Sequence, residues 1–353
     1  TLPDNEGKSY VERSKIDLTF VNWITSDDPS TRSSRGAGEY KQDFYYYPTN
    51  KLRIPVNKEN VLKSGIVKPE DADKIVDYID ITLPGAIDKA RIVMLDILAN
   101  NDWKRPIYFT GGSMDSAEYL WMKDYLQLDG LVYKLVPIKT PIDKNNPYDM
   151  GRIDSELMYN IVKRWTWGNM GKEGIYLDPE TRKNSIIFRG NLARLTEQLI
   201  AEGKTAKASE IINIAMKNMP IDAYGYYFTL DPFIEGSYKV GKKEQARAIA
   251  LQVIKKYQEE LNYYTHLPAG ELNSNAKRIQ YCIDRYGEVV MLSETLDKDF
   301  YAAQWAIFKD KAGLFMGEKE LEEYFKGAAS QAALDSLRNT LIDTTATSDS
   351  TEE

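Results

Sequence analysis

The chain has 353 residues, a formal net charge of −7, one cysteine and one histidine. This length suggests two domains, and a composition of 42% hydrophobic and 28% charged residues is that of ordinary soluble globular proteins. The negative charge argues against a nucleic-acid partner, because phosphate binding requires clustered Lys and Arg. No apolar run approaches the length of a membrane span.

The scarcity of cysteine and histidine argues against a metal or catalytic site. Cys282 lies within a helical pattern and is expected to be a buried free thiol. A Cys/His zinc site would need more ligands than Cys282 and His266 supply. A Ser-His-Asp triad would depend entirely on His266, which lies in a loop sequence. We therefore predict no catalytic residue, no metal and no cofactor in this chain.

The first 145 residues are expected to form one small domain. Residues 52–140 alternate strand and helix patterns, and this order predicts an α/β or α+β layer structure. Residues 30–38 are expected to be a loop, and residues 43–48 an aromatic edge strand. The predicted strands cover residues 52–56, 78–83, 106–110 and 131–137, and the predicted helices cover residues 57–63, 68–74, 87–100 and 113–121.

A polar and aromatic cluster, residues 100–105, lies between the predicted helix at 87–100 and the strand at 106–110. Trp103 and Arg105 are candidate binding residues in this cluster. The alternative is that polar groups at a helix end satisfy only the local backbone.

Residues 189–220 have the spacing of one tetratricopeptide-type helical hairpin. Gly203 is expected at the turn, and small Ala208 would let the two helices approach closely. Because one hairpin cannot bury its own apolar face, neighbouring hairpins must stack on it. The apolar positions are Leu192, Leu195 and Leu199 on the first helix and Ala208, Ile212 and Ala215 on the second.

Two further hairpins are expected after this one. Gly241 and Ala246 repeat the pattern of Gly203 and Ala208, with an insertion at residues 222–232. A third, less regular pair covers residues 276–296 and 300–315. We therefore predict an all-α, tetratricopeptide-like repeat domain over residues 146–340, followed by a disordered acidic tail, residues 341–353. The alternative is an ordinary antiparallel helical bundle.

The candidate binding residues of the repeat domain are aromatic or acidic. If the hairpins stack, their first helices line a groove that an extended segment could occupy. Tyr226, Tyr227 and Tyr238 flank the insertion, and Glu197 lies on a first helix, so these four are the candidate contacts. The alternative is that the tyrosines fill the space between repeats.

Three segments carry a resemblance to a known family: residues 97–110 (ILANNDWKRPIYFT), 125–137 (YLQLDGLVYKLVP) and 148–154 (YDMGRID). They resemble a domain of unknown function from large multi-pass membrane proteins common in Bacteroidetes, which are related to protein O-mannosyltransferases. The resemblance covers most of residues 70–260. It implies that the chain is the soluble C-terminal region of such a protein, on the extracytoplasmic (periplasmic) face of the inner membrane. The acidic catalytic residues of these glycosyltransferases lie in the transmembrane part, so none is carried over.

The first functional hypothesis is a non-catalytic, membrane-anchored region that contacts its own transmembrane domain and binds an acceptor polypeptide or a partner protein. Thr1 in place of Met is consistent with a piece of a longer protein. The alternative is a helical-repeat glycan-binding surface protein of the nutrient-uptake type, although its lipid-anchoring cysteine would be expected near the start of the chain. A freestanding hydrolase would need a nucleophile motif or a metal cluster.

Overall fold

The computed structural model describes residues 32–35, 42–45, 51–82, 89–110, 120–140 and 150–325. The chain divides into two compact units, Thr1–Thr166 and Trp167–Glu353. The division falls later than the boundary expected after residue 145, because helix α4 (Ser155–Lys163) packs on strand β6 (Leu126–Asp129) of the first unit. The predicted acidic tail and most of the predicted helix at 113–121 lie outside the described residues.

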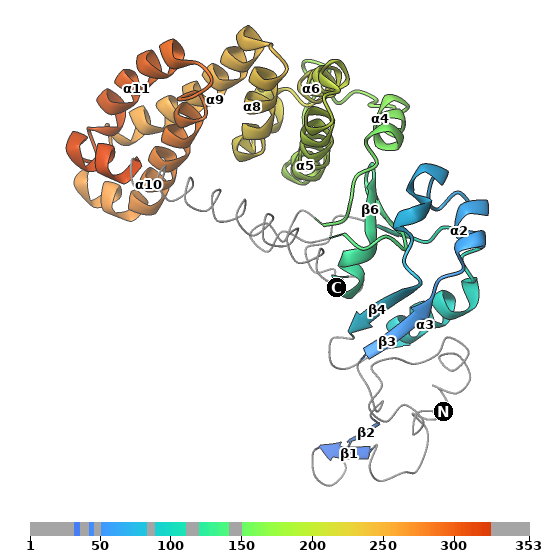
Figure 1. Cartoon of the computed structure of the whole chain (residues 1–353). Helices are drawn as coiled ribbons and strands as arrows, with labels where there is room; N and C mark the ends of the chain where they lie inside the picture. Colours follow the sequence, from blue (N-terminus) through green and yellow to red (C-terminus); the bar gives the residue numbers. More distant parts are fainter. Residues whose placement is uncertain are drawn as a thin grey trace, which may run out of the picture. The chain divides into compact units, whose positions relative to one another are not determined.

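The strands described in the first unit pair antiparallel, so the α+β alternative, rather than a parallel α/β layer, fits this part of the chain (Figure 1). Consecutive strands such as β3 and β4 pair directly with each other, so no βαβ crossover joins the strands that the structure describes. The pairs are β1 (Arg32–Arg35) with β2 (Gln42–Tyr45), β3 (Lys51–Pro55) with β4 (Tyr78–Thr82), and β7 (Val132–Leu135) with both β5 (Tyr108–Thr110) and β6.

One expectation for this unit was wrong, and one strand was missed. Residues 32–35 form strand β1 rather than a loop, because pairing with β2 outweighs their Ser- and Arg-rich composition. Strand β6 was not predicted, because Gln127 and Asp129 break its apolar pattern. Both of these side chains are nevertheless buried. The Gln127 amide donates to Asp129 at 2.8 Å, and Lys134 Nζ lies 3.2 Å from the Asp129 carboxylate.

The core of the first unit includes side chains of the β3–β4 pair, of helix α3 (Lys89–Asn101), and of strands β6 and β7. Ile79 and Ile81 point to the same side of β4, since alternate residues of a strand share a face. They are buried, as are Ile54, Leu95 and Leu98. Asn57 caps the short helix α2 (Lys58–Lys63), and the expected helix at 68–74 is the 3-10 helix η5 (Pro69–Lys74).

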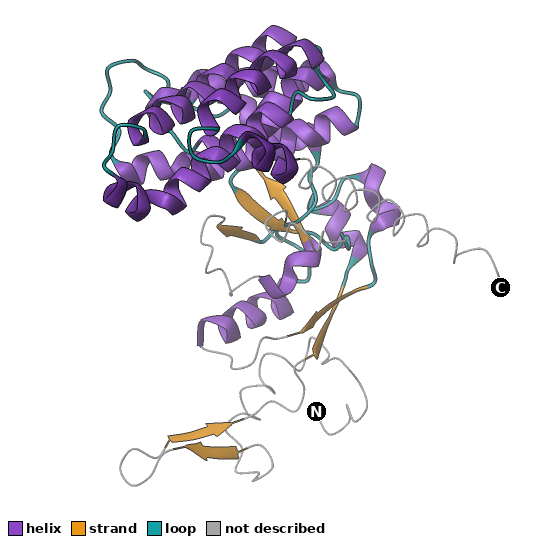
Figure 2. Ribbon diagram, turned by 90° about the vertical axis from the view of Figure 1, so that its left-hand side faces the viewer, coloured by secondary structure: helices purple, strands orange, loops and turns teal. Residues whose placement is uncertain are grey.

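The second unit is helical over its described residues (Figure 2). Helices joined by short turns pack side by side and therefore run antiparallel: α5 on α6, α8 on α9, α9 on α10, and α10 on α11. Helix α8 also packs on both α5 and α6. The elements are α5 (Pro179–Ala201), α6 (Thr205–Asn218), α7 (Ile221–Tyr224), η7 (Tyr227–Thr229), α8 (Asp231–Lys239), α9 (Lys243–Tyr264), α10 (Ala269–Met291) and α11 (Lys298–Ala312).

The helical character of this unit is confirmed, whereas its membership of the tetratricopeptide class stays a prediction. The two glycines expected at turns, Gly203 and Gly241, have left-handed φ angles of 72° and 76°, which favour glycine. Ala208 and Ala246 are fully buried where their helices pack. Helix α5 begins before the expected repeat start at Arg189, because Asp178 caps it and Pro179 occupies the first turn.

The end of helix α10 packs against an aromatic cluster formed by Tyr286, Trp305, Phe308 and Phe325. Gly287 makes this contact possible. A β-carbon at Gly287 would lie 2.2 Å from Cζ of Phe325, closer than any real contact. The absence of a side chain at this position therefore lets the Phe325 ring lie directly on the helix backbone.

Cys282, also on α10, is free and fully buried, as expected. Burial raises the pKa of its thiol to about 12, and the carboxylate of Glu260 acts in the same direction. The thiol is therefore protonated at neutral pH and unreactive in the folded protein.

Candidate functional site

Three tyrosines from different elements form a continuous row in the second unit, which we call the tyrosine row. Tyr227 of η7 meets Tyr257 of α9 edge to face, with ring centroids 5.9 Å apart, and Tyr257 meets Tyr281 of α10 in the same way at 6.5 Å. Tyr257 is buried at 2% exposure, whereas Tyr281 is 37% exposed and Tyr227 is half-buried. The row therefore has a buried centre and two ends that reach solvent.

The pKa values of two tyrosines in the row, Tyr227 and Tyr257, lie above the ordinary value for a phenol. Burial raises the pKa of Tyr227, and the neighbouring Asp222 adds to the effect while Lys256 opposes it. Burial likewise raises the pKa of Tyr257, with a further contribution from Tyr281 that Arg285 opposes. The phenols of Tyr227 and Tyr257 therefore stay protonated at neutral pH.

Tyr227 belongs to the segment between α6 and α8, residues 219–230, which we call the aromatic loop. It exposes Phe228 and half-exposes Tyr226, whose rings meet edge to face at 6.3 Å. Gly225 and Tyr226 both have left-handed φ angles, of 67° and 49°. A left-handed backbone conformation at a non-glycine residue raises the free energy of the folded state by about 1 kcal/mol or more. It persists only where surrounding contacts hold the backbone in place.

Arg189, which is fully buried in helix α5, supplies those contacts. Its Nη1 donates to the carbonyl oxygen of Gly225 at 2.6 Å, and its Nη2 donates to that of Met219 at 2.9 Å. Nη1 also lies 3.3 Å from the hydroxyl of Thr229. Burial lowers the pKa of Arg189 to about 10, so the side chain is still a cation at neutral pH. One buried guanidinium therefore fixes both ends of the aromatic loop.

A second contact fixes the loop from the other side. The hydroxyl of Tyr224 donates to the carbonyl oxygen of Met170, which lies at the start of the second unit. Close by, Gly171 lies against the last turn of α6, and a β-carbon there would be 2.4 Å from the carbonyl oxygen of Lys217. Hydrogen bonds to Arg189 of α5 and to Met170 therefore hold the aromatic loop in place.

The charged side chains around the tyrosine row are paired within the protein. Lys256 lies 3.1 Å from Asp222, Arg278 binds Glu260 through both carboxylate oxygens, and Arg285 donates to Asp231 at 2.6 Å. Arg278 also lies over the Tyr281 ring, 4.9 Å from its centroid. Burial raises the pKa of Asp231, and Arg285 opposes that shift. Lys256 also lies 3.5 Å from Glu259, and Arg285 also binds Glu288, so carboxylates outnumber bases around the row.

The structure brings only some of the predicted residues together. Tyr226 and Tyr227 share the aromatic loop, whereas Glu197 is exposed on α5 and makes none of the contacts that define the tyrosine row. Tyr238 has a different environment, since its hydroxyl donates to the buried carboxylate of Asp297 at 3.3 Å. Burial and Asp297 raise the pKa of Tyr238 to about 12. This side chain joins helices of the unit rather than forming an open surface.

Trp103 and Arg105 lie in the first unit. Trp103 is only 7% exposed, and its Nε1 donates to the carbonyl oxygen of Pro55 at 2.9 Å. Asp102 and Trp103 have left-handed φ angles of 49° and 58°, and the Asn60 side chain holds this turn by donating to the Asp102 carbonyl at 2.8 Å. These contacts favour the alternative in which the cluster satisfies its own backbone, while a binding role for exposed Arg105 stays a prediction.

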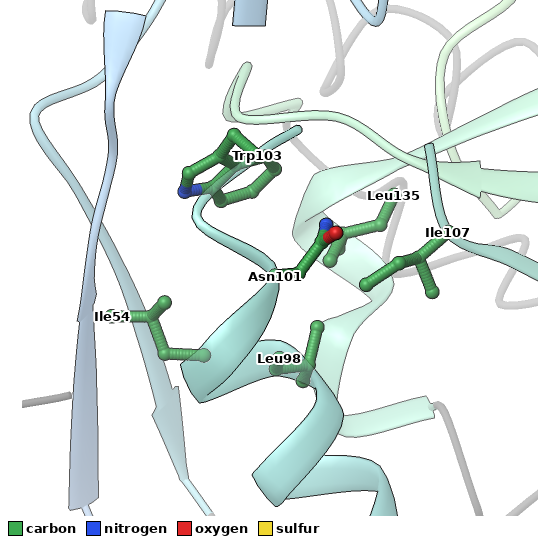
Figure 3. Close-up of a pocket in the computed structure, with 6 residues that line it drawn as sticks. All are labelled: Ile54, Leu98, Asn101, Trp103, Ile107 and Leu135. Atoms are coloured by element: carbon green, nitrogen blue, oxygen red, sulfur yellow. The ribbon is translucent and has the colours of Figure 1, made fainter. Parts of the chain in front are cut away.

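Trp103 also lines a small pocket, which Figure 3 shows in close-up. The pocket offers about 10 Å³ of free volume, about the room that a single water molecule needs. Its size excludes a sugar or a peptide side chain. The other lining residues are Ile54, Leu98, Asn101, Ile107 and Leu135.

Sequence reasoning missed Tyr257, Tyr281 and the anchoring role of Arg189. Tyr257 and Tyr281 fall on different helices, and their spacing along the chain carries no sign that their rings meet. Arg189 was identified only as the first residue of a repeat. Its position on the apolar side of a predicted helix was a usable signal. An arginine that is buried there needs hydrogen-bond acceptors, and this need indicates a role in holding nearby backbone.

Within the described ranges, no group of three or more His, Cys, Asp or Glu side chains is placed to hold a metal ion. In the same part of the chain, no helix combines the length and apolar character needed to cross a bilayer.

Comparison with known families places one match on the first unit. Residues 5–157 match the family described as TMEM260-associated domain 2. The match covers less than half of the chain, and it starts earlier and ends earlier than the resemblance noted over residues 70–260. No curated protein and no solved structure matches the chain.

Proposed function

We propose that this chain is a non-catalytic region of a membrane-anchored, O-mannosyltransferase-like protein, and that its helical unit binds the acceptor polypeptide or a partner protein. The observation that carries the proposal is the combination, in one chain, of a TMEM260-associated domain at residues 5–157 with a helical unit that presents the tyrosine row. TMEM260 is itself an O-mannosyltransferase-like protein.

The character of the second unit supports a binding role. Half-exposed tyrosines on a rigid support are typical of protein interfaces, because large rings bury much area at little cost in side-chain entropy. The aromatic loop is held by Arg189 and Tyr224 before any partner arrives. Preorganisation of this kind reduces the entropy that is lost on binding.

The rest of the proposal concerns the whole protein. The chain would lie on the extracytoplasmic face of the membrane, the periplasmic face in a bacterium, with the first unit next to its own transmembrane domain. Catalysis would belong to that transmembrane domain. The chain would position the acceptor and contribute no reacting group.

A comparison of two preparations tests this proposal. Membranes that contain the full-length protein are expected to transfer a sugar from a lipid-linked donor to protein, and the purified chain alone is expected to transfer none. In the full-length protein, Tyr226→Ala should lower acceptor glycosylation without lowering donor hydrolysis. The matched control is Tyr263→Ala, which removes an exposed tyrosine from the end of α9, outside the aromatic loop.

Two results would contradict the proposal. Turnover of a lipid-linked sugar by the purified chain would show that it is catalytic. A loss of melting temperature in Tyr226→Ala with unchanged acceptor glycosylation would show that this tyrosine is core. Binding of free oligosaccharides by the chain would instead support the alternative, a glycan-binding surface protein.

A further inference from the structure

We propose that the exposed side of helix α3, together with the basic turn that follows this helix, binds the headgroup region of an anionic lipid bilayer. This inference rests on the proposed function, because it identifies the surface of the first unit that would face the membrane. It is argued from the exposed apolar side of α3, from two cations held at the end of this helix, and from the local excess of basic residues.

Helix α3 carries apolar residues on two sides, and only one of these sides is buried. Leu95 and Leu98 lie in the core of the first unit, at 1% and 6% exposure, whereas Val93 and Ile97 are 51% and 53% exposed. Exposed positions that follow each other at intervals of three and four residues share one face of a helix. The exposed residues with this spacing are Ala90, Val93, Ile97 and Asn100, which we call the α3 stripe.

The turn after α3 fixes two cations close to the end of the stripe. Figure 3 shows Asn101 and Trp103 at this end of the helix. The contacts of Asp102 and Trp103 described above hold the turn, and the Asn101 amide also donates to the carbonyl oxygen of Arg105 at 2.7 Å. Lys104 and Arg105 follow directly and are exposed. The backbone that carries both cations is therefore held in place with respect to α3.

Both cations are available to a ligand. Within the part of the chain that the structure describes, the Arg105 guanidinium makes no hydrogen bond and no ion pair. Lys104 is 69% exposed, and its ammonium lies 3.7 Å from the Asp102 carboxylate, which already accepts a hydrogen bond from Asn60 at 3.0 Å. Residues 89–105 include four basic and two acidic residues, in a chain whose net charge is −7. This stretch is therefore cationic within an acidic chain.

An aliphatic stripe beside two cations is complementary to the boundary between lipid headgroups and acyl chains. The stripe can enter this boundary, while lysine and arginine side chains remain at the level of the lipid phosphates. A protein partner would instead be expected to meet aromatic anchors in shaped pockets. Ala90, Val93 and Ile97 provide no such anchor and no directed hydrogen bond. The chemistry therefore favours a lipid surface over a polypeptide.

Flotation of the purified chain with lipid vesicles tests the inference. Vesicles of phosphatidylcholine mixed with phosphatidylglycerol are compared with vesicles of phosphatidylcholine alone. We expect the chain to bind the anionic vesicles about tenfold more tightly, because each basic side chain near an anionic surface adds attraction. High salt should remove most of this difference, since it screens the cations.

Variants locate the contact on α3. Val93→Ser combined with Ile97→Ser should weaken binding to the anionic vesicles by about tenfold, because it removes the aliphatic centre of the stripe. Leu251→Ser is its control, since it removes a leucine of the second unit that is 44% exposed. Arg105→Gln should weaken binding by about fivefold, whereas Lys63→Gln, an equal change of charge at an exposed position of α2, should change it by less than about twofold.

A fluorescent label gives a readout that loss of fold cannot imitate. Because Cys282 is buried, Ile97→Cys can be labelled at one position with an environment-sensitive dye. We expect the emission of this dye to shift to the blue on anionic vesicles, and the emission of the same dye at Tyr176→Cys to stay unchanged. The melting temperatures of all variants should stay close to that of the wild type, because every replaced side chain is exposed.

Three results would overturn the inference. Failure of the chain to float with vesicles, or equal binding to both kinds, would reject an anionic lipid surface as the partner. Equal losses in Arg105→Gln and Lys63→Gln would show attraction by overall charge without a site at α3. Self-association of the chain that Val93→Ser with Ile97→Ser abolishes, without vesicle binding, would assign the stripe to a second copy. None of these results changes acceptor glycosylation by the full-length protein, which tests the proposed function separately.

Discussion

Arg247 on helix α9 donates two hydrogen bonds, of 2.7 and 3.0 Å, to the two carboxylate oxygens of Asp297, the residue that caps helix α11. The Asp297 carboxylate is almost fully buried and also receives the ammonium of Lys243 at 3.0 Å. Tyr238 of α8 adds a further hydrogen bond. A single side chain at the start of α11 thus ties this helix to the consecutive pair α8 and α9.

Replacing this carboxylate is expected to destabilise the second unit. Asp297→Asn keeps the shape but removes the charge that binds Arg247 and Lys243, and it should lower the free energy of unfolding by about 2 kcal/mol. Urea denaturation followed by circular dichroism gives the value. Asp299→Asn, at an exposed position in the same helical turn, should stay within about 0.5 kcal/mol of the wild type. Equal effects in the two variants would contradict the role assigned to Asp297.

Acid should weaken the same contact. Arg247, the largest influence, and Lys243 hold the pKa of Asp297 well below its ordinary value of 3.8. A carboxyl group whose pKa is lower in the folded state than in the unfolded state stabilises the fold at pH values above its unfolded-state pKa. This stabilisation is lost progressively as the pH falls from the unfolded-state pKa towards the folded-state pKa. Between about pH 6 and pH 3, the wild type should therefore lose more stability than Asp297→Asn. Identical pH profiles would exclude Asp297 as a source of acid sensitivity.

Gly287→Ala should disrupt the packing of Phe325 on helix α10. The added methyl would occupy the position of the ring, and overpacking of this kind costs roughly 1–3 kcal/mol. Gly270→Ala, in the same helix but with no atom within 4 Å of the new methyl, should be neutral or slightly stabilising. Melting curves of the two variants give the comparison, and a neutral Gly287→Ala would show that Phe325 does not pack there in solution.

Ala208→Trp should collapse the packing of α5 on α6. Ala208 is fully buried, so an indole there must push the helices apart, at a cost of roughly 1–3 kcal/mol or more. Ala206→Trp, at an exposed position of the same helix, is the matched control. An unchanged melting temperature for Ala208→Trp would show that the two helices do not cross at this residue.

Arg189→Met should release the aromatic loop. The change leaves the carbonyls of Met219 and Gly225 without their donor, and each buried unpaired group costs about 1–3 kcal/mol. Hydrogen exchange should accelerate across residues 219–230, and Arg189→Lys should restore part of the protection. Protection of the loop as strong in Arg189→Met as in the wild type would mean that Arg189 is not its anchor.

Sequence reasoning located most helices and several strands, because their patterns are local. The apolar spacing of α5 and α6 and the glycines at 203 and 241 determine hairpins within a short window. Ile79 and Ile81 alternate clearly enough to predict β4. The pairing of β1 with β2, by contrast, depends on a partner strand and not on the composition of residues 32–35.

The candidate site was harder to predict for a related reason. Tyr226 and Tyr227 attract attention because they fall in an insertion, whereas Tyr257 and Tyr281 look like ordinary helical residues until the helices pack. Tyr238 and Trp103, whose binding roles stay predictions, are the reverse case. Each is an aromatic residue in a prominent sequence context, and packing places each where it stabilises the fold.

The single buried thiol of Cys282 has a practical consequence for spectroscopy. Because the native cysteine does not react in the folded state, it need not be removed before fluorophores are attached elsewhere. Cysteines introduced in place of exposed Lys104 in the first unit and Tyr176 in the second would be the reactive pair. Dyes coupled to them would report, by energy transfer, whether the distance between the two labelled positions changes when a ligand is added.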